Sequence, residues 1–365
     1  MAQESTHSNS AQHLRSEQRP AAPAGTLAVG PVVLPTRVLQ APLSGISDVP
    51  FRRLARRFGA GAVVSEMVAS GELVRGDAES ALRAMRDGDG LHIVQLAGRD
   101  PAWMKLAAER LREDGADIID INMGCPAKKV VGGLSGSALM REPELALRLV
   151  EATVAGAGNV PVTLKMRLGW DRAHLNAAEI AVRAEAAGVR MITVHGRTRD
   201  QFYEGRADWP AIAAVKAVVS VPVVANGDLS DPADAPAMLA ASRADAVMIG
   251  RGTQGRPWLC GLAGGAIGRS DLARSSLADL VAEHYEAMLD HYGVGQGLRH
   301  ARKHLGWYAD RLAASSGADI GADRARLMTC GDPAEVCTLM RDLFGAATLA
   351  DVEPSLRSSP LAEAA

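Results

Sequence analysis

Residues 118 to 126 read Ile-Ile-Asp-Ile-Asn-Met-Gly-Cys-Pro. The run from Ile118 to Ile121 predicts a buried strand, and the small and polar residues after it predict that the strand ends there. The same pattern, an apolar run followed by polar or small residues, recurs along the chain. This stretch therefore sets the pattern from which the fold is predicted.

Eight such runs lie between residues 38 and 251, and each is followed by a stretch with helical spacing of its apolar residues. Strands that alternate with helix-length segments predict parallel βα units, and nearly continuous apolar runs indicate strands buried on both faces. Eight units predict a (β/α)8 TIM barrel of the α/β class, whereas a doubly wound open sheet, the alternative, usually has about five to seven strands. The runs are Val38 to Ala41, Ala62 to Ser65, His92 to Leu96, Ile118 to Ile121, Val162 to Met166, Met191 to Val194, Val221 to Ala225 and Ala246 to Ile249.

Beyond about Ser270 the strand pattern stops. Apolar residues then recur every three or four positions in Leu272 to Leu289 and in Gly297 to Leu312, which predicts helices. We therefore expect a flexible tail over residues 1–29, a catalytic barrel over 30–268, a small all-helical domain over 269–350 and a flexible tail over 351–365.

The composition is that of an ordinary globular chain, with 47% hydrophobic and 22% charged residues in 365. No apolar stretch reaches the roughly 18 residues that a membrane span requires. The first thirty residues lack the apolar core of a secretory signal, so we expect a cytoplasmic protein. The net charge of −2 gives no overall attraction for nucleic acid, and any RNA contact must come from a local basic patch.

The four cysteines show no C-x-x-C spacing, so neither a zinc site nor a thioredoxin-like site is expected, and no metal is predicted. Cys125 stands between Gly124 and Pro126 at the end of a predicted strand, where a side chain faces a ligand. Cys260 and Cys337 suit buried apolar positions.

Polar side chains follow seven of the eight runs, and the active site of a (β/α)8 barrel lies at the carboxyl ends of its strands. Each residue alone could cap a strand or pair within the core. Several polar side chains on one rim would have a large desolvation free energy unless a ligand or a dense hydrogen-bond network satisfied them. We therefore predict a polar ligand with an anionic group.

The last two runs end in Asn226-Gly227-Asp228 and Gly250-Arg251-Gly252, where barrels of this class commonly bind phosphate. Glycines there could also serve only to form tight turns. Gly132-Gly133-Leu134-Ser135-Gly136 lacks the ending and the spacing of nucleotide-binding loops, so we expect a mobile loop over the rim.

The sequence around these residues resembles the tRNA-dihydrouridine synthases, most closely the bacterial B type. The resemblance covers roughly residues 33 to 312, and its most specific element is Asn-x-Gly-Cys-Pro; the segment from Ala313 to Pro333 follows no pattern of the family. It is carried by Ala-Pro-Leu-Ser-Gly-Ile-Ser-Asp-Val-Pro-Phe-Arg from Ala41, Asp-Ile-Asn-Met-Gly-Cys-Pro-Ala-Lys-Lys-Val from Asp120, Lys-Met-Arg-Leu-Gly-Trp from Lys165, Val-His-Gly-Arg-Thr-Arg from Val194 and Ala-Arg-Lys-His-Leu-Gly-Trp-Tyr from Ala301.

The resemblance implies an FMN cofactor over the rim. The flavin ring would be contacted by Pro42, Leu43, Ser44, Gln95 and Lys165, with Lys165 near its N1 and O2 side. His195 would contact the flavin or its phosphate region. The phosphate end would be held by Asn226, Gly227, Asp228, Gly250 and Arg251. NADPH, or NADH, is the implied reductant, and because no Rossmann fingerprint is visible we expect it to bind transiently at the flavin face.

The reaction implied by the resemblance is reduction of the C5=C6 bond of uridines in tRNA. Hydride from reduced FMN would reach C6, and a protonated Cys125 would act as the general acid at C5. The Lys165 cation would stabilise the reduced flavin. Asn122 and Arg167 would hold the uracil, and Glu66 would contact the substrate or organise the rim.

The target uridine must leave the RNA stack to reach a flavin, so an RNA-binding surface is required. The basic segment Arg299 to His304 lies on a predicted helix, and the resemblance implies that the helical domain helps to bind tRNA, with Arg299, Arg302 and Lys303 as the candidate contacts. A solvated helix face is the alternative interpretation. We expect a monomer that binds neither DNA nor membrane.

Two other functions stay open at this point. One is a small-molecule FMN oxidoreductase of the dihydroorotate dehydrogenase type, which would share Lys165 and the phosphate end but has no need of a basic C-terminal helix. The other is a non-catalytic RNA-binding regulator, against which the joint presence of Cys125, Lys165 and Gln95 argues. The identity of the reduced uridine depends on how the whole tRNA docks, and the B-type resemblance suggests only the D-loop.

Overall fold

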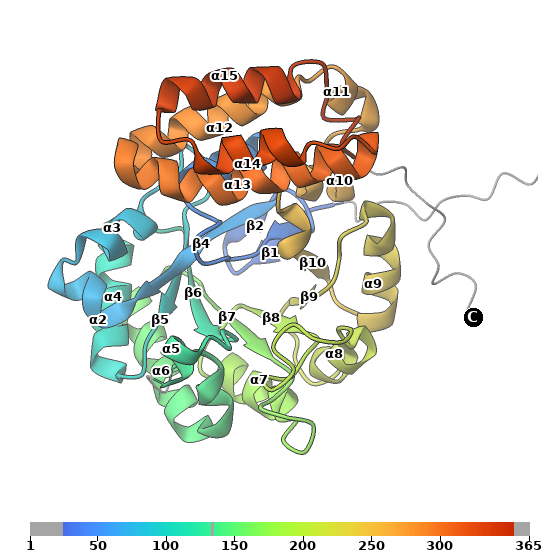
Figure 1. The fold of residues 1–365 in the computed structure, drawn as a ribbon. Coiled ribbons are helices and arrows are strands. Elements are labelled where there is room, and N and C mark those ends of the chain that lie inside the picture. Colours follow the sequence, from blue (N-terminus) through green and yellow to red (C-terminus); the bar gives the residue numbers. More distant parts are fainter. Residues whose placement is uncertain (1–24, 133–134, 354–365) are drawn as a thin grey trace, which may run out of the picture.

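The computed structural model describes residues 25–132 and 135–353, and its centre is a closed barrel of eight parallel strands in the order β10-β3-β4-β5-β6-β7-β8-β9 (Figure 1). The predicted (β/α)8 barrel is confirmed, and each of the eight apolar runs overlaps one of its strands. The strands of the chain are β1 (Leu27–Val29), β2 (Val32–Leu34), β3 (Val38–Gln40), β4 (Ala62–Ala69), β5 (Ile93–Ala97), β6 (Ile118–Met123), β7 (Val162–Arg167), β8 (Met191–His195), β9 (Val223–Asn226) and β10 (Ala246–Ile249).

The barrel closes where β10 pairs in parallel with β3, with Val247 opposite Val38. β4 is longer than its apolar run because it continues through Glu66 to Ala69. Its register against β5 shifts between Val64 and Met67. Such an irregularity changes the direction of the side chains near it, and it lies at the end of the barrel where the polar residues gather.

Helices follow the strands around the barrel, and three of them (α1, α4 and α8) begin at an aspartate that accepts a backbone N–H, with a proline in the first turn. This combination fixes helix starts because the carboxylate satisfies a free N–H and proline suits the first turn. The helices of the barrel region are α1 (Val49–Arg57), α2 (Ser70–Arg75), α3 (Ala78–Ala84), α4 (Pro101–Glu113), α5 (Lys128–Gly132), η1 (Gly136–Arg141), α6 (Pro143–Ala157), α7 (Ala177–Ala186), α8 (Trp209–Lys216), η2 (Pro232–Asp234), α9 (Ala235–Ser242), η3 (Arg251–Thr253) and α10 (Leu259–Gly264).

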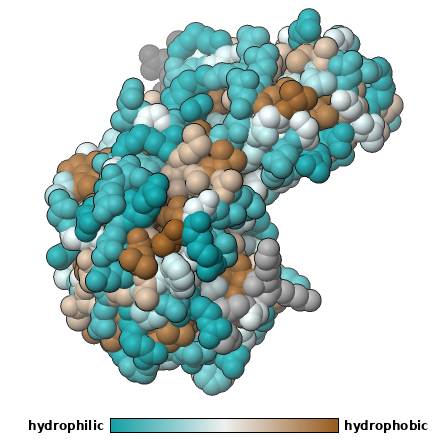
Figure 2. All heavy atoms as spheres, turned by 90° about the vertical axis from the view of Figure 1, so that its left-hand side faces the viewer, coloured by the Kyte–Doolittle hydropathy of each residue, from teal (hydrophilic) through white to brown (hydrophobic). Residues whose placement is uncertain are grey.

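The C-terminal region is helical, as predicted, and its helices pack on one side of the barrel (Figure 1). They share a hydrophobic cluster, which includes Leu277, Tyr285, Tyr308 and Phe344, separate from the clusters of the barrel. Figure 2 shows this helical part projecting past the barrel, with a hollow beneath it. Its helices are α11 (Arg269–Ala273), α12 (Leu277–Tyr292), α13 (Val294–Ser316), α14 (Gly321–Thr329) and α15 (Pro333–Phe344).

Described structure extends into both segments that are expected to be tails. β1 pairs with β2 in an antiparallel hairpin, and its residues Leu27 and Val29 pack with the first residues of several barrel strands, such as Ile118, so the hairpin covers the amino-terminal end of the barrel. At the other terminus Val352 and Glu353 are buried. Residues 1–24 and 354–365 lie outside the described residues, as do residues 133–134 of the loop expected to be mobile.

None of the helices in the described ranges has both the length and the apolar character needed to cross a membrane.

Candidate active site

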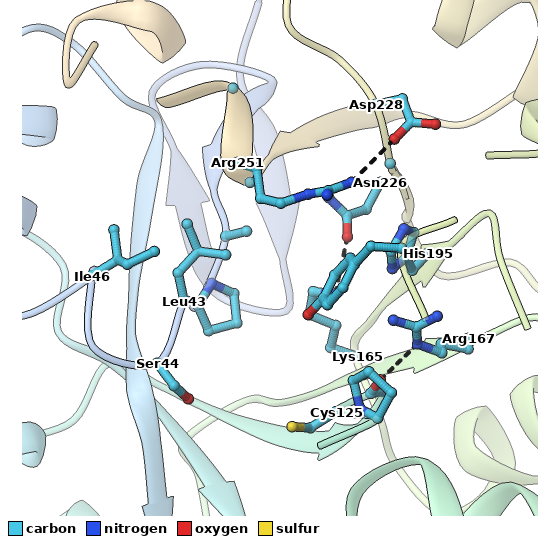
Figure 3. A pocket seen from close by; sticks show the side chains of 18 of the residues that line it. Leu43, Ser44, Ile46, Cys125, Lys165, Arg167, His195, Asn226, Asp228 and Arg251 are labelled. Atoms are coloured by element: carbon cyan, nitrogen blue, oxygen red, sulfur yellow. Dashed lines mark hydrogen bonds and ion pairs between the residues drawn. The ribbon is translucent and has the colours of Figure 1, made fainter. Parts of the chain in front are cut away.

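A cavity of about 770 Å3 opens at the carboxyl-terminal rim of the barrel, a size in the usual range for a bound small molecule. Most of the predicted site residues line it together (Figure 3). Those residues are Pro42, Leu43, Ser44, Gln95, Asn122, Cys125, Lys165, Arg167, His195, Asn226, Gly227, Asp228, Gly250 and Arg251. Glu66, Arg299, Arg302 and Lys303 are not part of the lining.

A chain of buried hydrogen bonds runs across three neighbouring strands at the floor of the cavity. Thr163 Oγ1 donates to Asp120 Oδ1 at 2.6 Å, and Gln95 Nε2 donates to the other carboxylate oxygen at 2.6 Å. Gln95 Oε1 accepts from Asn122 Nδ2 at 2.7 Å. Burial raises the pKa of Asp120, and these donors oppose the shift. The chain fixes which face of the Gln95 amide is presented to a ligand.

The turn that carries Cys125 is held from three directions. Asn122 Oδ1 accepts the backbone N–H groups of Gly124 and Cys125 at 3.1 and 3.0 Å. The Cys125 carbonyl accepts from Ser137 Oγ at 2.8 Å, and Arg167 Nε donates to the Gly124 carbonyl at 2.8 Å. The backbone that carries Cys125 is therefore held in place, and the sulfur of Cys125 points into the cavity (Figure 3).

Lys165 places a cation in the cavity, and no carboxylate of the described residues is in hydrogen-bond contact with it. Its Nζ donates to Asn226 Oδ1 at 3.0 Å, and Asn226 is itself oriented by a 2.8 Å bond to the Met248 carbonyl. Burial, followed by repulsion from Arg167, lowers the pKa of Lys165 to about 8. The residue is a desolvated ammonium that an anionic ligand would stabilise.

Arg167 positions a loop as well as the Cys125 turn. Its Nη1 donates to the carbonyls of Thr198 and Phe202 at 2.7 and 2.8 Å, and burial lowers its pKa to about 10. Tyr203, the next residue of that loop, lies with its ring 5.5 Å from the Arg167 guanidinium carbon and 4.6 Å from that of Arg251. The ring lines the cavity, so Tyr203 is a site residue that sequence position did not predict.

The end of the cavity near β9 and β10 contains paired charges. Both Asp228 oxygens accept from Arg197, at 2.8 and 2.7 Å, and Arg251 lies 3.6 Å away. Asp228 has a positive φ of 58° and also accepts the N–H of Ala207. Arg197, buried and not predicted, thus takes up the charge that would otherwise repel a phosphate here.

Gly227 and His195 pack closely beside this ion pair. A Cβ on Gly227, whose φ is 126°, would lie 2.7 Å from Ala207 Cβ and 2.9 Å from His195 Cδ2, so only glycine fits. Burial, and then the charge of Lys165, holds the pKa of His195 well below its usual range. His195 is therefore neutral at physiological pH.

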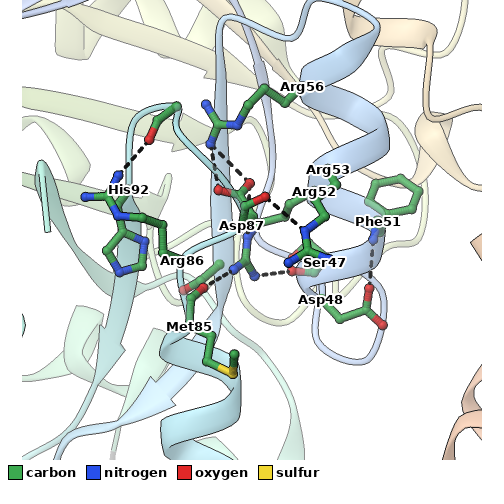
Figure 4. A network of polar contacts seen from close by, with 12 residues as sticks. Ser47, Asp48, Phe51, Arg52, Arg53, Arg56, Met85, Arg86, Asp87 and His92 are labelled. Atoms are coloured by element: carbon green, nitrogen blue, oxygen red, sulfur yellow. Dashed lines mark hydrogen bonds and ion pairs between the residues drawn. The ribbon is translucent and has the colours of Figure 1, made fainter. Parts of the chain in front are cut away.

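Glu66 organises the rim from outside the cavity. Its carboxylate accepts the backbone N–H of Gly45, in the loop that carries Leu43 and Ser44. The following turn is fixed by Arg52, which donates to the carbonyls of Ser47 and Met85 at 2.9 and 2.6 Å (Figure 4). The loop after β3 is thus rigidly attached before any ligand binds.

Arg52 is itself held in place by a buried carboxylate. Asp87 lies 3.7 Å from Arg52 Nε and 2.9 Å from Arg56 Nη2, so it neutralises two arginines of α1 (Figure 4). A buried arginine requires such a partner.

The three candidate RNA contacts on α13 lie in different surroundings. Arg299 is exposed, whereas Arg302 donates to the Cys330 carbonyl at 3.1 Å. Lys303 faces the barrel, since a Cβ on Gly45 would lie 2.9 Å from its Nζ, and burial lowers its pKa. The three cations therefore do not form one surface.

The sequence of this chain is similar to those of known proteins over most of its length. Residues 39 to 327 match the profile of the dihydrouridine synthase family. A probable tRNA-dihydrouridine synthase of Rhizobium leguminosarum bv. phaseoli is 57% identical, over 86% of this chain and 96% of its own. A tRNA-dihydrouridine synthase B of Xanthomonas axonopodis pv. citri is 46% identical, over 90% of this chain and 98% of its own.

Among solved structures, a 6-hydroxypseudooxynicotine amine oxidase from Pseudomonas geniculata N1 superposes with a TM-score of 0.52 at 15% identity. The match covers 66% of this chain and 49% of that one, and it shows that the two share a fold.

Proposed function

The chain belongs to the dihydrouridine synthase family, and from this premise we propose that it reduces the C5=C6 bond of uridines in tRNA with a flavin mononucleotide bound in the rim cavity. NADPH is the proposed reductant, with NADH as the alternative. The observation that carries the proposal is that Cys125 and Lys165 line one cavity in a chain of this family.

The residues of the cavity fit a flavin. Lys165 and the Gln95 amide supply donors and an acceptor for a heterocyclic edge, and Leu43 supplies an apolar surface. A Cβ on Gly250 would only touch Leu43 Cδ2 at 3.7 Å, so the absence of a side chain leaves room for a ring or its ribityl chain. When bound, reduced FMN would supply the hydride that reaches C6 of uracil.

Cys125 would supply the proton. Hydride at C6 leaves negative charge on C5 and its conjugated carbonyl, and a positioned acid must protonate C5 to complete the addition of two hydrogens. The bonds from Asn122, Ser137 and Arg167 hold the backbone of the turn that carries the thiol. The structure thus supports an acid role in which the cysteine needs no activation as a nucleophile.

Lys165 would hold an anionic flavin, because its buried ammonium gains most from a nearby negative charge. The uracil would lie between the flavin and the wall that contains Asn122, Arg167 and Tyr203. Asn122 and Arg167 form hydrogen bonds with the backbone of the Cys125 turn, so part of their role is to position that turn. The exposed Tyr203 ring offers a flat face to a base.

RNA would also contact the helical part. We retain the division into a barrel over residues 30–268 and a helical domain over 269–350, which the separate hydrophobic clusters support. Arg299 is exposed and suited to a phosphate contact, whereas Arg302 and Lys303 mainly attach α13 to its neighbours. The hollow beneath this part gives a bulky substrate access to the rim (Figure 2).

The proposal is tested by incubating unmodified tRNA with the purified protein, FMN and NADPH, and measuring dihydrouridine by nucleoside mass spectrometry with site mapping. Cys125→Ala should lose most of the product while it binds flavin like the wild type. Cys330→Ala, a matched change outside the cavity, should retain full activity.

Two outcomes would contradict the proposal. If Cys125→Ala makes dihydrouridine at the wild-type rate, the acid assignment is wrong. If the wild type oxidises NADPH but leaves tRNA unchanged, a small-molecule oxidoreductase becomes the better description.

A further inference from the structure

The helical part contributes a charged side chain, Arg311 of α13, to the cavity. It lies with Ser230 and Gln254 among the lining residues at the end of the cavity near β9 and β10. One turn earlier on the same side of α13, Trp307 packs on the loop after β10, where a Cβ on Gly255 would lie 2.8 Å from the Trp307 carbonyl oxygen. Arg311 is therefore held at this end by the packing of α13.

Arg311 lacks a carboxylate partner, whereas the arginines near it are paired. Arg256 forms a buried ion pair with Glu353, which also accepts from Trp258 Nε1 at 2.8 Å. Arg197 pairs with Asp228. Among the described residues, no carboxylate lies within ion-pair distance of Arg311, and burial lowers its pKa. A half-buried, unpaired guanidinium is costly unless an anion binds it.

The charges at this end of the cavity do not balance. Arg251 and Arg311 line the cavity together with one carboxylate, Asp228, whose charge Arg197 already neutralises, whereas Arg256 and Glu353 lie outside the lining and neutralise each other. The excess is two positive charges. A phosphate monoester carries nearly two negative charges at neutral pH, whereas an RNA phosphodiester carries one. The balance therefore favours a terminal phosphate.

We propose that Arg311 binds the terminal phosphate of the flavin mononucleotide, so that the helical part completes a cofactor site otherwise built by the barrel. The inference rests on the proposed function, because it takes FMN as the cofactor. The planar guanidinium can donate two parallel hydrogen bonds to phosphate oxygens, which lysine cannot.

The test compares FMN with riboflavin, which has the same ring and side chain but no phosphate. Dissociation constants are measured by flavin fluorescence on the apoprotein of the full chain, in the absence of RNA. Arg311→Gln should weaken FMN binding by at least about tenfold and leave riboflavin binding within about twofold, since a charge-assisted hydrogen bond is the interaction removed. Arg311→Lys should lie between the wild type and the Gln variant.

Arg341→Gln is the matched control, because it removes an exposed arginine from the same helical part outside the cavity. Both of its dissociation constants should equal those of the wild type. The Lys variant retains a cation at this position. A folding defect in any variant would show as a lower midpoint of thermal unfolding.

Three results would overturn the inference. If Arg311→Gln weakens FMN and riboflavin equally, Arg311 only maintains the shape of the cavity. If flavin binding is unchanged but tRNA binding becomes weaker and less sensitive to salt, the phosphate belongs to RNA. If the wild type binds no flavin at all, the proposed function fails as well. Because flavin binding is measured without RNA and tRNA binding is measured separately, loss of the phosphate contact is distinguishable from a failure to make dihydrouridine.

Discussion

The protonation state of Lys165 depends on what the cavity binds. Its ammonium group has lost most of its water and lies near Arg167, and both effects lower its pKa to about 8. Asp120 opposes the shift by its negative charge. An anionic ligand would favour the charged form further, so ligand binding and protonation of Lys165 are coupled.

We expect binding of reduced FMN, whose ring is anionic at pH 9, to take up close to one proton at that pH. Without ligand, Lys165 is mostly neutral above pH 8, and a nearby anion raises its pKa, so the complex holds a proton that the free protein lacks. Affinity for reduced FMN should accordingly fall as the pH rises above about 8. Calorimetry in buffers of different ionisation enthalpy measures the uptake. Lys165→Met should abolish it, and an undiminished uptake in that variant would show that another group titrates.

Placement in the cavity was predictable where a side chain lies at or just beyond the carboxyl end of a strand. Gln95, Cys125 and Lys165 were found in this way, because the ends of parallel strands meet at one rim. Tyr203 escaped prediction because it lies in a loop eight residues beyond the end of β8. Arg311 escaped because only tertiary packing of α13 brings it to the cavity. The bonds by which Asn122 and Arg167 hold the Cys125 turn go to backbone atoms, which residue types do not reveal.

At the scale of elements, α10 crosses the end of α1 at very close range. A Cβ on Gly261 would overlap the carbonyl oxygen of Phe58, the residue that ends α1. Backbone atoms on both sides leave no flexible side chain that could move away. The contact brings the segment after β10 against the first helix of the barrel.

Gly261→Ala should lower the free energy of unfolding by about 3 kcal/mol or more, because overpacking of this kind forces the two helices apart. Gly295→Ala is the control: it lies near the start of α13 with open space around it, and alanine there should be neutral or stabilise by up to about 1 kcal/mol. Urea unfolding monitored by circular dichroism measures both. Equal stability of the two variants would mean that the helices separate without cost.

Elements were predictable in proportion to their length and burial. All eight barrel strands and the long helices α12 and α13 follow from apolar periodicity. β1 was assigned to a tail because its three residues directly follow a polar stretch with clustered Pro and Ala. α14 was not placed, since only one of its nine residues, Leu327, is buried and its sequence shows no apolar stripe.

On the scale of the whole molecule, two ion pairs join the barrel to the C-terminal region in different surroundings. Arg256 and Glu353 are buried, with side chains 2% and 1% exposed, and Arg256 also donates to the Ser230 carbonyl at 2.7 Å. Arg57 and Glu283 form a 2.6 Å pair whose side chains are about half exposed. Burial decides what each pair contributes.

Glu353→Ala should lower the free energy of unfolding by about 3–5 kcal/mol, because it leaves Arg256 as an unpaired buried charge. Glu283→Ala should cost less than about 1 kcal/mol, because water solvates the arginine that remains. Chemical denaturation at one pH and salt concentration compares the two. A similar small cost for both would show that water reaches Arg256.

The Arg256–Glu353 contact also has a consequence for biosynthesis. Its two partners are 97 residues apart in the chain, and the barrel itself closes only when β10 returns to β3. During synthesis on the ribosome, Arg256 in the loop after β10 can therefore be neutralised only after Glu353 has emerged. A nascent chain interrupted before residue 353 would carry an uncompensated charge beside the ligand cavity, which gives truncated products a built-in disadvantage in reaching the native state.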